Sequence, residues 1–367
     1  MTTKQSIARL KKKIGDGVIT VAEQKPLEVI STGITPLDIA LGVGGLPRGQ
    51  ITHIWGSPSS SKTSMVNHMV GEMQKRDKEA CACYIDIEHS LRAEWLAKFG
   101  IDPDRTVIVS ASTIEDAMND MMAVMAEGIF DIVVVDSIGA LVRSVEIDGK
   151  DGKGADAHDA SFGGVSALVT RWVKAVNSTL IRMDNRRYAG EDVKLPAVVF
   201  INQQRDDIGS MFAGAKKFSG GNALQHQMYI NIRLKASGAA ADKIYGTVNG
   251  KKAQVGTLIT ANIEKNKAAA PFRLGSWQFV YDDCPEYEFG VQQDRAKVDA
   301  AIEYGIVQVG GGGWITYPDE NGEEQRIRSR DSLVNLIKEN PALGEFFAEQ
   351  VVKKVRSTEV SVDVAEG

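Results

Sequence analysis

The sequence predicts an α/β protein built around a mostly parallel β-sheet, and three observations lead to that prediction. Runs of β-branched residues alternate with segments of helical periodicity from about residue 50 to residue 203. One run, FDIVVVDS at 130–137, contains four consecutive β-branched residues, which is typical of a parallel strand buried on both faces. A glycine- and serine-rich turn, GSPSSSKTS at 56–64, lies between a predicted strand and a predicted helix, where α/β proteins bind phosphate groups.

The predicted elements begin with an N-terminal arm at 1–30. Its helix, over residues 1–14, carries Ile7, Leu10 and Ile14 on one side among lysines. This apolar stripe needs a cover, which either a neighbouring subunit or the protein's own core can supply. The core, at 31–280, then alternates strands at 50–56, 80–88, 105–111, 130–137, 195–203, 229–236 and 258–266 with helices at 62–76, 91–99, 114–126 and 162–183.

Two long segments interrupt this alternation. Residues 144–161 are rich in Gly and Asp, and residues 204–221 are rich in Gly and Ser with two adjacent lysines. Long loops inside a compact domain are usually functional or disordered. From 281 to 350 the pattern becomes that of a small α+β domain, with a hairpin turn at Asn321-Gly322 and a helix over 331–355. Residues 351–367 form a polar tail.

Composition narrows the class of protein. The 367 residues are enough for two domains, and 43% hydrophobic with 25% charged residues is ordinary for a globular protein. A net charge of -5 excludes a uniformly basic nucleic-acid-binding surface, so any such site must be a local patch. Three cysteines are too few for a disulfide framework, and Cys81 and Cys83 are expected to be buried and structural. No apolar run reaches the length of a membrane span, so we expect a cytoplasmic protein without membrane contact.

The turn at 56–64 is close to the phosphate-loop pattern G-x-x-x-x-G-K-[ST]. Gly56, Lys62 and Thr63 match it, but Ser61 stands where the second glycine belongs. Backbone N–H groups and a helix N-terminus would hold the phosphates, with Lys62 adding charge and Thr63 binding Mg²⁺. If position 61 needs a positive φ, Ser costs about 1 kcal/mol or more there; if it needs only a small residue, Ser is suitable.

Carboxylates follow two other predicted strands. Asp136 ends the run at 132–135, at the sheet edge where open α/β proteins bind ligands, and can hold Mg²⁺ through water. In YIDIEHS, Asp86 and Glu88 project to one side of their strand. Glu88 lies nearer the ligand edge, so we prefer it as the base that activates water and assign Asp86 to a buried hydrogen-bond network.

Longer motifs resemble the bacterial RecA recombinases over roughly residues 15–350. They are STGITPLDIALGVGGLPRGQI at 31–51, GSPSSSKTS, YIDIEHSL, IVVVDSIGAL, FINQQRDDIGSMF, SGGNAL and EKNKAAAPF at 264–272, and they occur in that family's order. The resemblance implies a RecA-type P-loop ATPase core with a short N-terminal helical arm and a small α+β C-terminal domain. It also implies ATP and Mg²⁺ as cofactors, polymerisation on single-stranded DNA, and strand exchange with a homologous duplex.

The resemblance also assigns roles to residues. Lys62, Thr63 and Asp136 would bind MgATP, Glu88 would activate water, and Gln203 would sense the γ-phosphate and move the loop that begins at Gln204. Lys265 and Lys267 would reach the ATP of a neighbouring subunit. The full nucleotide site would comprise Gly56, Ser57, Pro58, Ser59, Ser60, Ser61, Lys62, Thr63, Ser64, Arg92, Trp95 and Asp136.

DNA binding is assigned to two loops, 144–166 and 204–221, and to the start of the long helix. Basic side chains there can hold phosphates while Met or Phe wedges between bases, although Asp206 and Asp207 oppose a simple basic patch. Without the resemblance, these residues leave DNA binding open. The predicted DNA contacts are Arg171, Lys174, Arg205, Ile208, Met211, Phe212, Lys216, Lys217, Ser219, Gly220, Gly221 and Asn222.

Several positions depart from the family pattern. Ser61 replaces the usual Gly, at a position that varies among phage-encoded members; Arg92 replaces an Asp near the adenine; and Trp95 stands near the position of a stacking Tyr. Gln225-His226 replaces Lys-Phe after GGNAL, which puts the coupling between subunits in doubt, and residues 186–196 are extra. Together these differences suggest a divergent recombinase, encoded by either a bacterium or a phage.

Two other functions compete with the recombinase. A hexameric helicase or motor of the same fold would share Lys62, Glu88 and Asp136 but would not need SGGNAL or EKNKAAAPF. A binding protein whose phosphate loop has decayed through Ser61 would have no physical reason to keep Lys62, Thr63, Glu88 and Asp136 on one sheet edge.

Overall fold

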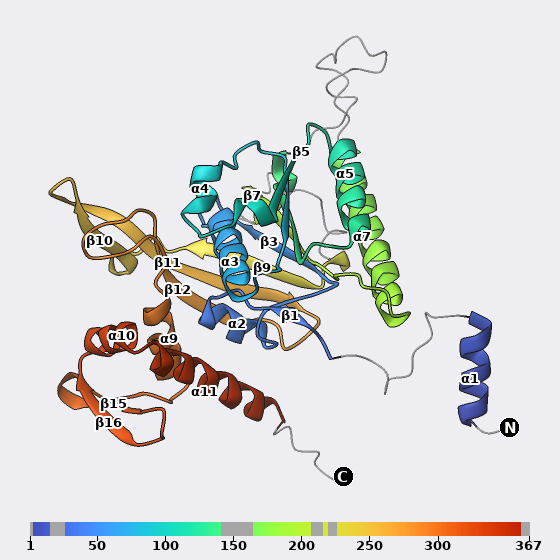
Figure 1. The fold of residues 1–367 in the computed structure, drawn as a ribbon. Coiled ribbons are helices and arrows are strands. Elements are labelled where there is room, and N and C mark those ends of the chain that lie inside the picture. The colour runs from blue at the N-terminus through green and yellow to red at the C-terminus, as the bar shows by residue number, and fades with distance from the viewer. Residues whose placement is uncertain (1–2, 15–25, 141–163, 207–215, 219–225, 361–367) are drawn as a thin grey trace.

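The computed structural model describes residues 3–14, 26–140, 164–206, 216–218 and 226–360. Within them, eleven strands form one sheet in the order β13-β12-β11-β9-β3-β7-β6-β4-β5, with β8 beside β7 and β10 beside β11 (Figure 1). The predicted α/β class is confirmed. The strands that pair in parallel are β9 (Ile230–Ala236), β3 (Ile51–Gly56), β7 (Ala197–Asp206), β6 (Ile132–Asp136), β4 (Ala82–Asp86) and β5 (Thr106–Ser110).

An antiparallel extension continues this sheet beyond β9. In this extension the sequence pattern predicted only one strand, at 258–266. The observed strand β11 is longer, at 16 residues, because it pairs with β9, β10 and β12 along its length. The antiparallel strands are β8 (Lys216–Phe218), β10 (Lys243–Val248), β11 (Lys251–Asn266), β12 (Leu274–Val280) and β13 (Gly290–Val291). Since β13 still pairs with β12, the main sheet reaches past the domain boundary predicted at 281, and the domain limits stay predictions.

Helices cover both faces of the parallel part. Val133 and Val135 of β6 pack with α5 (Ile114–Glu127) and α7 (Gly164–Tyr188), while Ile132 and Val134 pack on the other side. This alternation explains the continuous β-branched run, because each residue is buried on one face or the other. The second side is covered by α2 (Thr35–Leu41), α3 (Lys62–Arg76) and the short α4 (Ala93–Ala97), with β1 (Val29–Ile30) paired to β2 (Leu46–Pro47) nearby. Cys83 is fully buried as expected, whereas Cys81 is only half-buried.

The C-terminal elements form a third apolar core. It joins α9 (Gln293–Glu303), β15 (Trp314–Pro318), α10 (Arg330–Glu339) and α11 (Pro341–Val360), and Ile39 of α2 links it to the main body. The predicted hairpin is confirmed by β15 pairing with β16 (Glu324–Arg328); β14 (Gln308–Val309) completes that sheet. Residues 331–355 are helical as predicted, but the chain forms two helices there because Pro341 disfavours helical geometry at Asn340.

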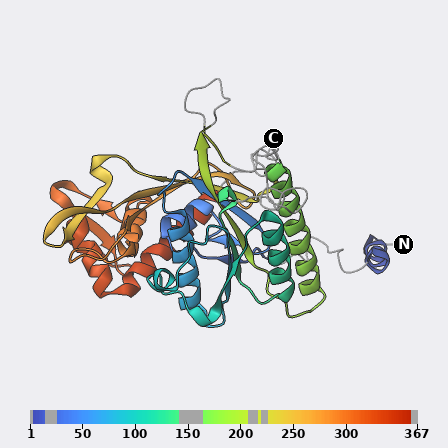
Figure 2. The ribbon, with the colours of Figure 1, turned by 90° about the horizontal axis from the view of Figure 1, so that it is seen from above.

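The N-terminal helix α1 (Thr3–Ile14) lies away from the rest of the molecule (Figures 1 and 2). None of its residues is buried, and the side chains of Leu10 and Ile14 are 45% and 63% exposed. The protein's own core therefore does not cover the apolar stripe.

Candidate nucleotide-binding and catalytic site

The predicted phosphate loop connects β3 to α3, and its geometry requires glycine at its start. A Cβ on Gly56 would lie 2.3 Å from the carbonyl oxygen of Leu234 and 2.6 Å from Ser60 Oγ. Both distances are shorter than real Cβ contacts, so no larger residue fits. Glycine at position 56 therefore allows the end of β3 to lie close both to the backbone of β9 and to the loop that follows.

Ser61, the residue in place of the usual glycine, has a left-handed backbone with φ 62° and ψ 28°. Ser59 also has a positive φ, of 58°. An L-residue in this region costs about 1–2 kcal/mol, which explains why glycine is the common choice at position 61. The hydroxyl side chain adds no steric block to the fold, since α3 still begins directly at Lys62.

Two polar groups in this loop fit a polyphosphate ligand. Lys62 is 9% exposed, and its ammonium donates hydrogen bonds to the carbonyl oxygens of Ser57 (2.8 Å) and Gly56 (3.3 Å). Burial lowers the pKa of Lys62, while the charges of Asp136 and Glu88 act in the opposite direction. Ser60 Oγ is fully buried without a hydrogen-bond partner. A buried ammonium, an unsatisfied hydroxyl and the N-terminus of α3 form a suitable environment for phosphate oxygens.

Thr63 and Asp136 form the candidate magnesium site. Thr63 Oγ1 donates a 2.7 Å hydrogen bond to Asp136 Oδ2. Burial raises the pKa of Asp136 to about 6, with the nearby charges of Glu88 and Asp86 adding to the shift. Among the described residues, no three His, Cys, Asp or Glu side chains are clustered for metal binding. One hydroxyl and one carboxylate fit Mg²⁺ that takes its remaining ligands from water and phosphates.

Glu88 lies just past the end of β4, beside the end of β6 and the Gln203 position of β7. Its Oε1 accepts hydrogen bonds from Ser137 Oγ, just past β6, and from Gln203 Nε2 on β7, at 2.9 Å. The neighbouring order β7-β6-β4 produces this convergence, because parallel strands end on the same edge of the sheet. Ser137 was not predicted as a site residue; its position directly after Asp136 was the available signal.

Asp86 has a different environment. It is buried, and its carboxylate accepts hydrogen bonds from the backbone N–H groups of Ser90 and Leu91 at 3.3 and 3.1 Å. These bonds hold the turn that follows β4. Asp86 therefore lies in a buried hydrogen-bond network as expected, and the role of Glu88 as the catalytic base stays a prediction.

Lys265 and Lys267 lie near each other at the end of β11. Lys265 Nζ donates to the carbonyl oxygen of His226 at 3.0 Å, and Lys267 Nζ lies 6.0 Å from the ring centroid of Tyr229. Burial lowers the pKa of Lys265, and the charge of Lys267 lowers it further. The two ammonium groups are therefore close enough to repel each other, and their contact with the ATP of a neighbouring subunit stays a prediction.

Arg92 immediately precedes α4, and Trp95 lies within that helix. Arg92 donates to the carbonyl oxygen of Leu91 at 3.0 Å. The indole of Trp95 lies edge-on to Phe99 and Phe289, with both centroid distances at 5.4 Å. These contacts place Trp95 in an aromatic cluster, and its contact with adenine stays a prediction.

The predicted DNA contacts are only partly described. Arg171 and Lys174 are exposed on α7, opposite its buried residue Trp172. Arg205 pairs with Lys217 between β7 and β8, and Asp206 pairs with Lys216, so the two ends of the second loop form an antiparallel ladder. The 144–161 segment, most of the loop predicted at 144–166, and the predicted contacts Ile208, Met211, Phe212, Ser219, Gly220, Gly221 and Asn222 lie outside the described residues.

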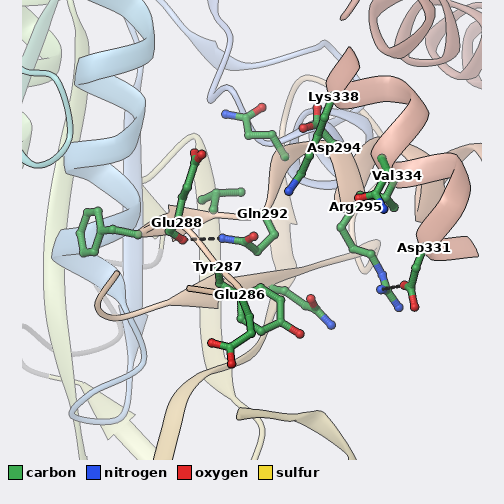
Figure 3. Close-up of a pocket in the computed structure, with 14 residues that line it drawn as sticks. Glu286, Tyr287, Glu288, Gln292, Asp294, Arg295, Asp331, Val334 and Lys338 are labelled. Atoms are coloured by element: carbon green, nitrogen blue, oxygen red, sulfur yellow. Dashed lines mark hydrogen bonds and ion pairs between the residues drawn. The ribbon is translucent and has the colours of Figure 1, made fainter. Parts of the chain in front are cut away.

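A separate cleft of about 460 Å³ lies between the main sheet and the C-terminal elements (Figure 3). Glu288, Gln292 and Lys338 line it, and an Arg295–Asp331 ion pair of 2.8 Å joins α9 to α10. It contains none of the predicted site residues. Within the described part of the chain, no helix has the length and apolar content of a membrane span.

The family profile and three related proteins that match this chain are all named for RecA. The family profile described as RecA N-terminal domain matches residues 2–284, which include every described side chain of the candidate site. The chain is 30% identical to Protein RecA of Streptomyces venezuelae over 353 residues, covering 95% of this chain and 83% of the relative. It is 31% identical to Protein RecA of Paenarthrobacter aurescens over 367 residues, covering 96% of both. Protein RecA of Acidothermus cellulolyticus is 30% identical over 331 residues, covering 90% of this chain and 84% of the relative.

Proposed function

We propose, from the premise that this chain belongs to the RecA family, that it is an ATP-dependent recombinase. It binds single-stranded DNA in the cytoplasm, polymerises into helical filaments, and exchanges strands with a homologous duplex while hydrolysing ATP. The observation that carries this proposal is the convergence of Glu88, Gln203 and the Thr63–Asp136 pair beside the phosphate loop. A decayed loop would have no reason to keep these groups together.

In the proposed mechanism, the loop at 56–64 holds the phosphates of ATP through backbone N–H groups and the ammonium of Lys62. Thr63 and Asp136 hold Mg²⁺, which supplies positive charge to the phosphate oxygens when it is bound. Glu88 accepts a proton from the attacking water, because it is the exposed carboxylate at this edge. Arg92 and Trp95 are proposed to contact the adenine ring.

Gln203 is proposed to report the state of the nucleotide to the DNA-binding loop. Its amide contacts Glu88 at 2.9 Å, and the next residues of β7 pair with β8. A change in the hydrogen bonds of Gln203 would therefore act directly on the strand that begins the second DNA loop. Arg205, Lys216 and Lys217 are then proposed to hold the DNA phosphates.

Filament formation is proposed to involve α1 and the lysine pair. The uncovered stripe Ile7, Leu10 and Ile14 is suited to packing on a neighbouring subunit, and a contact that does not close generates a helical filament. Lys265 and Lys267 would face the ATP of that neighbour. Hydrolysis would then depend on assembly, as it does when an arginine finger acts in trans.

Electron microscopy with single-stranded DNA, ATP and Mg²⁺ tests the proposal. Open helical filaments that exchange strands with a homologous duplex are expected. Closed rings would favour a hexameric motor instead, and the absence of any nucleotide-dependent assembly would favour a binding protein.

A further inference from the structure

A β-bulge in β11 brings a carboxylate into the space behind the phosphate loop. In the ladder with β9, Ile263 pairs with Ile232 and the next pair is Lys265 with Asn231, so Glu264 is an extra residue without a partner position. Bulges of this kind re-aim a side chain and are common beside functional sites. Here the bulge directs Glu264 toward β3.

Glu264 receives two hydrogen bonds in that space. Its Oε2 accepts from Trp55 Nε1 at 3.0 Å and from Asn231 Nδ2 at 3.3 Å. Burial raises the pKa of Glu264, and Trp55 and Arg233 act against this shift. A carboxylate held by two strands at once fixes the position of β11 relative to β3.

Arg233 is the link between Glu264 and the strand that carries Gln203. Its guanidinium carbon lies 4.9 Å from the ring centroid of Trp55, and Nη1 lies 4.0 Å from Glu264 Oε1. Nη2 donates to Gln204 Oε1 at 3.4 Å. A planar guanidinium can stack on an indole and donate at its edges at the same time, which a lysine cannot do.

Three residues of this network are adjacent in sequence to proposed functional residues. Trp55 precedes Gly56, Gln204 follows Gln203, and Glu264 precedes Lys265. The network thus joins the beginning of the phosphate loop, the beginning of the second DNA loop and the interface lysines. Its Arg233 end is 38% exposed, so the contact with Gln204 contributes little to stability and can be exchanged for others.

We propose that Arg233 is a positioning residue that couples the nucleotide site to the DNA-binding loop, with Trp55 and Glu264 as its support. The inference rests on the proposed function, because it assumes that nucleotide and single-stranded DNA bind to the same molecule. When Gln203 changes its contacts, Gln204 moves with it, and Arg233 transmits that movement to β3 and β11. By linkage, the same coupling makes bound DNA strengthen nucleotide binding.

The test measures the affinity of the full chain for a fluorescein-labelled oligo-dT strand by anisotropy, with and without a slowly hydrolysed ATP analogue and Mg²⁺. The coupling ratio is the dissociation constant for DNA without the analogue divided by the dissociation constant with it. We expect Arg233→Ala to reduce this ratio at least tenfold, while the dissociation constant of the analogue without DNA changes less than threefold. Lys235→Ala is the matched control, because Lys235 is an exposed cation on the same face of β9, and it is expected to leave the ratio unchanged.

A double-mutant cycle then tests the contact itself. Arg233→Ala and Gln204→Ala are expected to reduce the ratio non-additively, and Arg233→Lys to restore less than half of it. Additive effects, or a normal ratio in Arg233→Ala, would overturn the inference while leaving the recombinase proposal intact. A ratio of one in the unmodified protein would instead refute both. Thermal melting of each variant shows whether a lost ratio reflects unfolding; Gln204→Ala, at a partly exposed position, serves if Arg233→Ala unfolds.

Discussion

Thr63 Oγ1 lies 2.7 Å from Asp136 Oδ2, although the two residues are 73 positions apart in the chain. Thr63 lies in the first turn of α3 and Asp136 ends β6, so the contact exists only because β6 and the phosphate loop reach the same edge of the sheet. The pair places a carboxylate in a largely buried position close to two other acidic groups. That arrangement has a cost in stability that can be measured.

Asp136→Asn is expected to stabilise the protein and abolish its magnesium-dependent nucleotide binding. The folded pKa of Asp136, about 6, lies above its ordinary value of 3.8, so the folded state holds a proton that the unfolded chain has released between these pH values. The contribution of Asp136 to the free energy of unfolding is therefore lost as pH rises from about 4 to about 6. Asn has no carboxyl group to ionise, so the variant does not lose this stability as pH rises.

Urea denaturation at several pH values measures the effect. At pH 8 the free energy of unfolding of the Asn variant is expected to exceed that of the unmodified protein by up to about 3 kcal/mol. Below pH 4 the two free energies of unfolding should differ little. Asp282→Asn, at a carboxylate whose side chain is 68% exposed, serves as the control. An equal gain at both pH values would contradict the assignment.

Glu88→Gln is expected to bind ATP normally while its turnover falls by about 10²-fold or more, because the amide keeps the shape but cannot accept the proton. Filaments on DNA should persist longer. Phosphate release and nucleotide binding are measured on the same preparation. Normal turnover in this variant would return attention to Asp86.

Ser61→Gly is expected to stabilise the folded protein by about 1 kcal/mol, since glycine adopts the left-handed backbone of position 61 without strain. The KM for ATP should change less than about tenfold, which corresponds to under ~1.4 kcal/mol. Thermal melting and steady-state ATPase assays check both expectations.

Lys62→Ala should abolish nucleotide binding or turnover, and unchanged ATPase activity in this variant would refute the phosphate-loop assignment.

Lys267→Ala is expected to bind nucleotide almost normally but to lose DNA-stimulated hydrolysis, because the ammonium acts on the ATP of the neighbouring subunit. Mixing it with Lys62→Ala should restore part of the activity, since one type of interface then combines an intact loop with intact lysines. ATPase activity is followed across mixing ratios. If mixed filaments form and none of them hydrolyses ATP, the assignment in trans fails.

Replacing Lys216 and Lys217 together by Ala is expected to remove up to two phosphate contacts. The slope of log K against log salt for single-stranded DNA should then flatten by up to about 1.4. Fluorescence titrations at several salt concentrations provide the slope. Arg182→Ala, an exposed cation on α7 outside the predicted contacts, is the control. An unchanged slope and affinity in the double variant would place the DNA site elsewhere.

The sequence by itself determined the local features of this protein. The β-branched run at 132–135 and the flanking helical periodicity predict a parallel sheet because a strand buried on both faces has no place for polar residues. The spacing of Gly56, Lys62 and Thr63 predicts a phosphate loop, because a strand, a tight turn and a helix N-terminus must follow one another directly.

Only the tertiary structure decided which distant groups meet. Ser137, Gln203 and Glu88 come together because the parallel strands β4 and β6 end beside β7, and the order of strands in a sheet is not encoded in any one of them. The bulge that aims Glu264 at Trp55 depends on the register of β11 against β9, and the pattern LITANIEKN alone predicts a regular strand. The left-handed backbone of Ser61 likewise follows from the turn between β3 and α3, because φ is set by the path that the chain must take. Contacts of this kind are fixed by packing across the sheet, and local sequence patterns carry no information about it.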